Sequence, residues 1–220
     1  MRNVARFMLA NLQDFDPRKD AVPYEELTAL DRWALMGMQE VIDRITRAFD
    51  KWDLHFFHHE LNQFLANDLS AFYLDVLKDT LYTDLPDAPL RRSAQTVLWY
   101  LLTDLARLMA PILPFTAEEI WQHLRQLDND LGLSVHTEDW PVLRSHWRDA
   151  KLGKQFQLVV RVRGKVAETL EAAKQLGILT NPLEARVTLY APASYREVLE
   201  SLGTEELKRV LIVSQVEVRD

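Results

Sequence analysis

The 220-residue chain contains no cysteine, which excludes disulfide bonds, thiol catalysis and zinc sites built from cysteine. Long apolar runs are also missing. No window reaches the roughly 18 consecutive apolar residues that a membrane-spanning helix needs. The opening residues lack the apolar core and the cleavage site of a secretory signal. We therefore expect a cytoplasmic protein with no membrane partner.

Catalytic and ligand-binding motifs are equally scarce. The six glycines are scattered, so no glycine-rich loop can hold a dinucleotide or a phosphate, and there is no HExxH motif or nucleophile elbow. His55 and His59 have a spacing that can bind a metal on one helix face, but no third ligand stands at a set spacing. We predict packing or surface roles for these histidines, no metal site and no catalytic residue.

Positive charge is scarce overall but concentrated in one segment. The chain has 26 Lys and Arg against 33 Asp and Glu, a net charge of −7. Residues 144–165 carry seven basic residues and one acid, a local charge of +6, which leaves −13 for the remainder. This segment could dock one polyanion, or it could be a solvated helix face that nearby acids balance.

Apolar residues recur every three or four positions through residues 1–126, a spacing typical of helices that bury one face. Long stripes of this kind joined by short loops favour an antiparallel helical bundle, so the predicted fold class is mainly α. The predicted helices cover 2–12, then a stretch that begins at a cap formed by Thr28 and Asp31, then a stretch from Asp53 to Tyr82 that bends near Asn67, and finally 87–110.

The helical pattern stops after residue 126. Residues 127–150 have no clear period and are predicted to form a crossing segment. Residues 151–220 mix helix and strand patterns, which predicts a small α+β junction unit. Its predicted elements are a helix over 153–176 that ends before Gly177, a half-buried strand over 183–190 with Leu183, Ala185, Val187 and Leu189 on one face, a helix over 194–208, and one or two strands in 209–220.

The stretch "LARLMAPILPFTAEEIWQHL", residues 105–124, predicts a sharp corner between two helices. Pro111 and Pro114 lack amide protons and disfavour helical dihedrals at the preceding residue. The helix should therefore end near Met109, and "PILPF" should cross the bundle in an extended conformation.

The same corner has the spacing of a capping box. Thr116 stands three residues before Glu119, and Phe115 and Ile120 occupy the flanking positions of a hydrophobic staple. No side chain here suits catalysis, so the corner is expected to be structural. Replacing Pro111 or Phe115 should lower stability before it affects any binding.

Two pairs of arginines could each face a phosphate, because the guanidinium group matches phosphate oxygens. Arg2 and Arg6 lie one helical turn apart, opposite the apolar stripe. Arg91 and Arg92 fall near the start of a helix, where the helix dipole disfavours cations. The alternative for the second pair is ion pairing with Asp84 and Asp87.

Several blocks of the sequence resemble one known family. "RNVARFMLANLQDFDPRKDAV", "FYLDVLKDTLYTD", "APILPFTAEEIW" and "LEARVTLYA" resemble the C-terminal part of bacterial isoleucyl-tRNA synthetases, in the family's order and over nearly the whole chain. The first and third blocks also occur, more loosely, in valyl and leucyl enzymes. The second and fourth point to the isoleucyl branch.

This resemblance implies a class I anticodon-binding bundle that docks on the anticodon stem-loop of tRNA(Ile). In the family, aminoacylation uses ATP and magnesium in a catalytic module, whose HIGH-type and KMSKS-type signatures are missing here, as is the editing module. Zinc would belong to a C-terminal module that this sequence stops before or lacks. Residues 1–220 alone are therefore not expected to be an enzyme. The implied partners are tRNA(Ile) and the parent chain's other modules, and a monomer is expected.

Twelve residues are candidates for contacting tRNA, through phosphate contacts by Arg and Lys or stacking by Tyr. The resemblance suggests those of the opening helix and of the "LKDTLYTD" block, and local charge suggests the others. For each residue the alternative is structural, with the asparagines as local caps and the tyrosine at the rim of the core. The candidates are Arg2, Asn3, Arg6, Asn11, Lys78, Tyr82, Arg91, Arg92, Lys151, Lys154, Arg161 and Arg163.

Two other functions stay open at the level of sequence. One is the anticodon-binding module of a valyl- or leucyl-type synthetase. The other is a helical protein-interaction module with no RNA role, which predicts one contiguous apolar patch and no basic patch on the folded surface.

Overall fold

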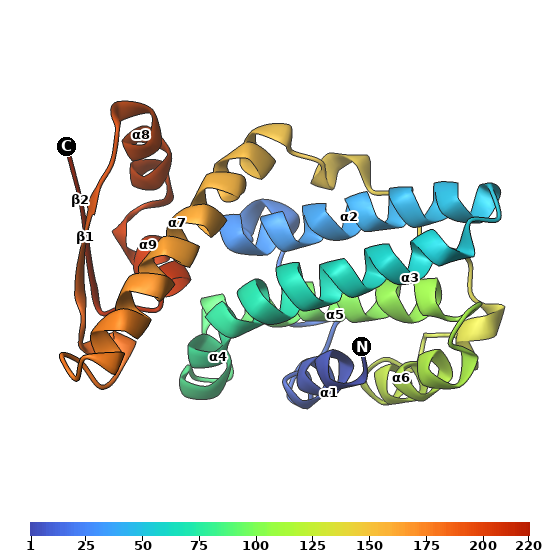
Figure 1. The fold of residues 1–220 in the computed structure, drawn as a ribbon. Helices are drawn as coiled ribbons and strands as arrows, with labels where there is room; N and C mark the ends of the chain where they lie inside the picture. The colour runs from blue at the N-terminus through green and yellow to red at the C-terminus, as the bar shows by residue number, and fades with distance from the viewer. The chain divides into compact units, whose positions relative to one another are not determined.

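The computed structural model describes all 220 residues, and the chain divides into two compact units, Met1–Asp149 and Ala150–Asp220. Helices dominate both units, and one small sheet lies in the second (Figure 1). The predicted class, a mainly α bundle followed by a small α+β unit, is confirmed. None of the helices combines the length and the apolar character needed to cross a membrane.

The first unit is a bundle whose helices begin close to the predicted positions. Thr28 caps the second helix by accepting a hydrogen bond from the amide of Asp31, as its spacing predicts. Asp53 caps the third in the same way, through the amide of Phe56. The helical elements are α1 (Arg2–Ala10), η1 (Tyr24–Glu26), α2 (Ala29–Asp50), α3 (Leu54–Gln63), η2 (Phe64–Tyr73), α4 (Leu74–Thr83), α5 (Pro89–Met109), α6 (Pro114–Leu127), η3 (Val135–Thr137) and η4 (Ser145–Trp147).

α5 is the central helix of this unit, since it packs against α1, α2, α4 and α6 and is buried on nearly every side. Its burial also hides polar groups, which must then find partners inside the protein. The carboxylate of Asp31 is fully buried and accepts hydrogen bonds from the hydroxyls of Tyr73 at 2.6 Å, Ser93 at 2.5 Å and Thr28 at 2.9 Å. This network ties α2 to η2 and α5.

The predicted bend near Asn67 is a change of helix type. η2 is a π-helical segment that joins α3 to α4 without a break, so the chain stays helical from Leu54 to Thr83. π-helical turns are rare and are often found at functional sites.

The crossing segment after α6 is held by side chains, which explains why it shows no apolar period. Trp140 donates its indole N–H to Thr46 of α2 at 2.8 Å, and the amide of Arg144 donates to Gln39 at 2.7 Å. The guanidinium of Arg144 also reaches the buried carboxylate of Asp104 in α5, at 2.8 Å. The segment therefore fastens α2 and α5 together.

The corner between α5 and α6 differs from the predicted one. α5 ends at Met109 as predicted, but Ala110 keeps helical dihedrals, and the amide of Leu113 donates to the Met109 carbonyl at 2.7 Å. The connection is thus a tight turn and not an extended crossing. α6 begins at Pro114, because proline suits the first helical position, where its missing amide proton is not needed.

This early start removes the predicted capping box and staple. Thr116 lies inside α6, Leu113 takes the N-cap position, and no side chain caps the helix. Phe115 is 89% exposed, so it forms no staple with the buried Ile120. The expectation that Phe115 stabilises the corner is therefore wrong.

The second unit contains α7 (Ala150–Gln175), η5 (Pro182–Glu184), β1 (Arg186–Tyr190), α8 (Ala193–Leu202), α9 (Thr204–Leu211) and β2 (Gln215–Arg219). β1 and β2 form a two-stranded parallel sheet in which Arg186 is opposite Gln215 and Tyr190 is opposite Arg219. A small core of Val166, Leu211 and Val213 joins α7 to the end of α9, and strand residues pack against it.

Two predictions for this unit need correction. The first part of the expected strand is a tight helical turn, because Asn181 and Glu184 form a capping box around Pro182, and Leu183 is 48% exposed. The expected helix over 194–208 is two helices that meet at Gly203, whose φ of +80° breaks the α conformation. Residues 209–211 finish α9, and the one strand that follows agrees with the predicted one or two.

Candidate nucleic-acid interface

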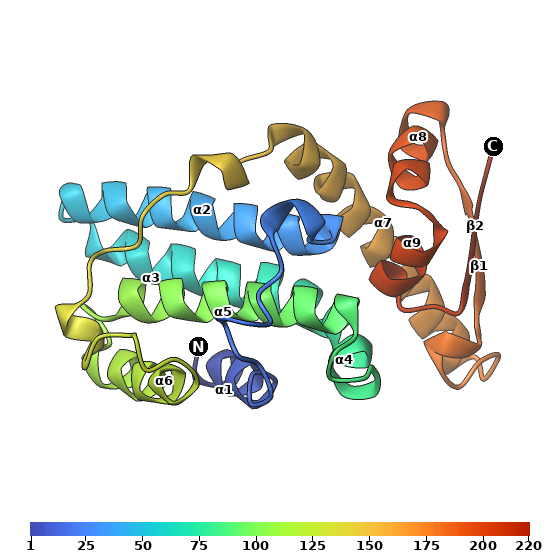
Figure 2. The same ribbon diagram turned by 180° about the vertical axis from the view of Figure 1, so that it is seen from behind.

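α1 presents its polar side chains to solvent, as its spacing predicts. Met8 is fully buried, whereas Arg2, Asn3 and Arg6 are exposed. α1 packs against α5 and α6, and it lies between α6 and α4 (Figures 1 and 2). These three helices form one face of the bundle, and this face gathers candidate residues that are far apart in the sequence.

Arg2 is already held by a partner on α6. Its guanidinium donates to the carboxylate of Glu119 at 2.6 Å, and both side chains are mostly exposed. The hydrogen bond and the positive charge of Arg2 lower the pKa of Glu119. An exposed pair of this kind contributes little to stability and can exchange its partner, so Arg2 remains accessible to a phosphate.

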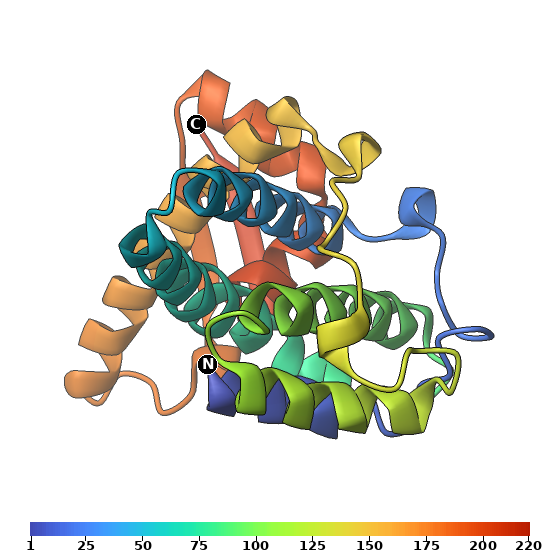
Figure 3. The same cartoon turned by 90° about the vertical axis from the view of Figure 1, so that its right-hand side faces the viewer.

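Arg6 has no carboxylate partner. The other candidate arginines of the first unit, Arg2, Arg91 and Arg92, each pair with a carboxylate. It borders a groove of about 260 Å³ between α1 and α6, whose other polar side chains are Gln13, His123 and Gln126. Figure 3 shows the two helices running side by side. A free guanidinium beside two amides suits a ligand with a phosphate and hydrogen-bonding edges.

Lys78 and Tyr82 lie one turn apart on α4, next to α1. The ring of Tyr82 lies 6.2 Å from that of Phe7 in α1 and is 64% exposed. Lys78 donates to Asp75 at 2.9 Å in an exposed pair. Phe7 thus supports a tyrosine whose ring is still open to stacking on an unpaired base.

Asn11, Arg91 and Arg92 have structural partners. Asn11 is buried, and its side-chain amide donates to the Phe7 carbonyl at 2.8 Å. This bond fits the alternative given for Asn11, a local cap. Arg91 donates to both carboxylate oxygens of Asp14 at 3.1 Å and to a backbone carbonyl of α4. Arg92 donates to the Asp14 carbonyl at 2.8 Å and lies 3.4 Å from the carboxylate of Asp20.

The two arginines are therefore ion-paired, as the alternative proposes, but with other acids. Asp84 and Asp87 are not their partners, because the segment after α1 folds over the start of α5 and brings Asp14 and Asp20 there instead. Only 14% of the Arg91 side chain and 17% of the Arg92 side chain are exposed.

Several basic residues of segment 144–165 have acidic partners. Arg144 pairs with Asp104, Arg148 with Asp43 and Lys165 with Glu168. Arg163 donates to the carbonyl of Val210 in α9. Lys151, Lys154 and Arg161 are exposed, and Arg161 donates to the Gln157 carbonyl of its own helix at 3.4 Å.

The histidines near α3 do not assemble a metal site. His58 interacts with Asn62 one turn further along the same helix, and no group of three or more His, Asp or Glu side chains in the chain could hold a metal ion.

Gln13, His123 and Gln126 line the groove beside Arg6, and the sequence does not single them out. Each is a polar residue on an exposed helical surface or loop, which is ordinary in a soluble protein. They come together only because α1 packs on α6, more than a hundred residues further along the chain.

A helical bundle that displays an unpaired arginine, a supported tyrosine and a polar groove on one face has the features of an RNA-binding module. The chain matches the family model of the anticodon-binding domain of tRNA ligase over residues 31–181, which is more than half its length. The chain belongs to this family. α1 lies outside the matched residues, although the relatives described next align with it as well.

Similar proteins are isoleucine–tRNA ligases of bacteria. The chain is 44% identical to that of Persephonella marina over 220 residues and 46% identical to that of Moorella thermoacetica over 217 residues. It is 40% identical to that of a Sulfurihydrogenibium species over 220 residues. The chain spans about a quarter of these relatives, 23% of the length of each.

Proposed function

We propose that residues 1–220 bind the anticodon stem-loop of tRNA(Ile) as a module of an isoleucine–tRNA ligase. The module would position the tRNA for ATP-dependent aminoacylation by a catalytic module outside this chain. The observation that carries the proposal is the face formed by α1, α4 and α6, where Arg6 is unpaired beside a polar groove and Tyr82 is exposed. The identity to isoleucine–tRNA ligases supports this choice over a valyl- or leucyl-type module.

Each part of this face has a distinct role in the proposal. Arg6, assisted by Arg2 and Lys78, would neutralise loop phosphates, which positions the RNA without reading its sequence. Tyr82 would stack on an unpaired base of the loop. The amides of Gln13 and Gln126 could read the edge of a base that enters the groove. Asn11, Arg91 and Arg92 are left out of the contact surface, because their side chains are committed to internal partners.

ATP and Mg²⁺ find no matching site among these residues. No cluster of acidic side chains could hold a metal ion, and the glycines form no phosphate loop. We infer that residues 1–220 alone do not form aminoacyl-adenylate. ATP–pyrophosphate exchange catalysed by this chain with isoleucine would contradict that inference.

The test is fluorescence anisotropy with an RNA hairpin that has the sequence of the tRNA(Ile) anticodon arm. Binding should weaken steeply with added salt, because loop and stem phosphates provide most of the affinity. Changing the anticodon bases should weaken binding by about tenfold, since a mismatched base costs roughly 1–3 kcal/mol. Tyr82→Ala should weaken binding by about tenfold as well, and Tyr82→Phe should keep the stacking and most of the affinity.

Two outcomes would refute the proposal. Equal affinity for hairpins with the isoleucine, valine and leucine anticodons would exclude specific recognition. Complete absence of binding at low salt would leave a protein-interaction module as the remaining function.

A further inference from the structure

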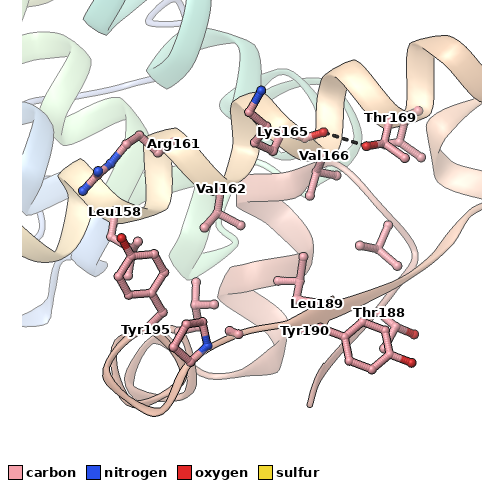
Figure 4. A pocket seen from close by; sticks show the side chains of 15 residues that line it. Leu158, Arg161, Val162, Lys165, Val166, Thr169, Thr188, Leu189, Tyr190 and Tyr195 are labelled. Atoms are coloured by element: carbon pink, nitrogen blue, oxygen red, sulfur yellow. Dashed lines mark hydrogen bonds between the residues drawn. The ribbon is translucent and has the colours of Figure 1, made fainter. Parts of the chain in front are cut away.

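The second unit contains a larger cavity that the RNA proposal does not use. It has a volume of about 450 Å³ and lies between α7, β1 and the start of α8. Figure 4 shows Val162 and Val166 pointing from α7 towards the strand, and Leu189 pointing back towards the helix. Tyr195 of α8 and Arg161 of α7 also line it. The cavity is an apolar groove along a strand.

The strand beside this groove has one unpaired edge. β1 pairs only with β2, and the amide of Ala191 donates to the carbonyl of Arg219 at 3.0 Å. Backbone groups along a strand alternate in direction, so the N–H and C=O groups of Val187 and Leu189 also face β2. Those of Thr188 and Tyr190 face the opposite edge, where no strand is present, and both residues line the groove.

A two-stranded parallel sheet is small for such a unit. Sheets of this size are marginal unless further strands or helices cover them, and parallel strands are normally buried. An exposed edge next to apolar side chains is also a template for pairing with another strand.

We propose that an extended segment of the same ligase polypeptide, from outside residues 1–220, pairs with the free edge of β1 in this groove. The inference rests on the proposed function in one respect, that these residues belong to a longer ligase chain, as the 23% coverage of the relatives supports. Edge pairing gives an extended segment its main-chain hydrogen bonds, and an apolar groove accommodates alternate side chains.

The charged residues of α7 indicate which side chains the bound segment carries. Arg161 lines the groove and makes no ion pair, whereas Lys165 on the next turn is neutralised by Glu168 at 2.7 Å. The bound strand therefore places apolar side chains under α7 and an acidic side chain opposite Arg161.

Amide hydrogen exchange tests the inference without RNA. Exchange is measured at single residues in the 220-residue chain and in the full-length polypeptide that contains it. The amides of Thr188 and Tyr190 should exchange at least about tenfold more slowly in the full-length polypeptide, because a new backbone hydrogen bond protects them. The amides of Val187 and Leu189 are internal controls, since β2 already binds them in both proteins.

A matched pair of variants in the full-length polypeptide locates the effect. Val162→Asp places a charge inside the groove and should remove the added protection, while Val160→Asp, on an exposed part of the same helix, should keep it. If Val162→Asp unfolds the unit, the control amides lose protection as well, and the wild-type comparison still decides the question.

Equal exchange of Thr188 and Tyr190 in the two proteins would overturn the inference. Protection that appears only when tRNA is added would overturn it too, because the groove would then hold RNA. Hairpin binding is measured separately on the 220-residue chain, so a failure of the proposed RNA function is distinguishable from a failure of strand pairing.

Discussion

The first half of α1 and the start of α5 each carry two arginines, and the two pairs have opposite surroundings. Arg91 and Arg92 are mostly buried and donate to the carboxylate and the carbonyl of Asp14. Arg2 and Arg6 are exposed, the first in a single exposed ion pair and the second in none. The pair at α5 is part of the interior, and the pair at α1 is available to a ligand.

The two pairs are nevertheless connected. The segment that leaves α1 is fixed at the start of α5, where Gln95 donates to the Asn11 carbonyl and to the Asp14 carboxylate, both at 2.8 Å. Arg91 binds the same carboxylate. The buried arginines therefore hold the end of α1, and so they help to orient the helix that displays Arg6.

The largest expected effect comes from removing the acid that both buried arginines share. Asp14→Ala leaves the guanidinium of Arg91 and the fully buried amide of Gln95 without a charged acceptor. We expect a loss of about 2 kcal/mol in the free energy of unfolding, since hydrogen bonds to charged groups contribute about 1.5–3 kcal/mol. Urea unfolding followed by far-UV circular dichroism measures it.

Glu119→Ala is the matched control, because it removes the acid that pairs with an arginine of α1. Its ion pair is exposed, so the loss should stay below about 1 kcal/mol. Equal losses of unfolding free energy in the two variants would show that the buried and the exposed arginine pairs contribute equally to stability.

A smaller effect is expected on RNA affinity when Arg6 is removed. Arg6→Ala should weaken hairpin binding by about tenfold and reduce the salt dependence by about one phosphate contact, with no change in stability. Arg47→Ala removes the same charge from an exposed site on α2 and should change affinity little. If both variants weaken binding equally, net charge and not the α1 face determines affinity.

The sequence predicts well what depends on neighbours along the chain. The spacing of Met8 and Leu12 shows which side of α1 is buried, and Thr28 marks the start of α2. It cannot predict partners that folding brings from a distance. Arg91 and Asp14 lie 77 positions apart along the chain, and nearer acids look like equally good partners.

Local rules also fail where two of them compete. Thr116 and Glu119 fit a capping box, but Pro114 fits the first helical position. In the structure α6 begins at Pro114, so the capping box does not form. The groove beside Arg6 and the free edge of β1 depend on packing between separate elements, and no local pattern encodes them.

A pH titration extends the comparison to Asp104 and Asp14, each of which binds an arginine. Folding shifts their pKa values in opposite directions, so their contributions to stability change with pH in opposite directions. Burial raises the pKa of Asp104, and Arg144 only partly opposes this rise. Partial burial also acts to raise the pKa of Asp14, but hydrogen bonds from Arg91 and Gln95 outweigh it and the pKa is lowered. The stability from Asp14 is thus present above the ordinary carboxyl pKa and is lost as the pH falls through its lowered value.

Asp104 behaves in the reverse way. Its folded form holds the proton more tightly, so its contribution to stability is present below the ordinary pKa and declines as the pH rises through the raised value. Asp104→Asn should therefore flatten that decline, and Asp14→Asn should remove the loss on the acid side. Unfolding free energies measured by urea titration between about pH 3 and pH 6 test both slopes. Changes in slope of the same sign on the two substitutions would contradict the opposite pKa shifts of Asp104 and Asp14.

The smallest expected effect belongs to Phe115, which lies on α6 four residues before Glu119, the partner of Arg2. Because its ring is 89% exposed, Phe115→Ala should change the unfolding free energy by no more than about 0.5 kcal/mol. Ile120→Val on the buried side of the same helix removes only one methylene group but should cost about 1 kcal/mol. Thermal unfolding of both variants measures the difference. A larger loss of unfolding free energy for Phe115→Ala would mean that the ring packs against the helix in solution. The exposed side of α6 would then stabilise the bundle and also contribute to the face that displays Arg6.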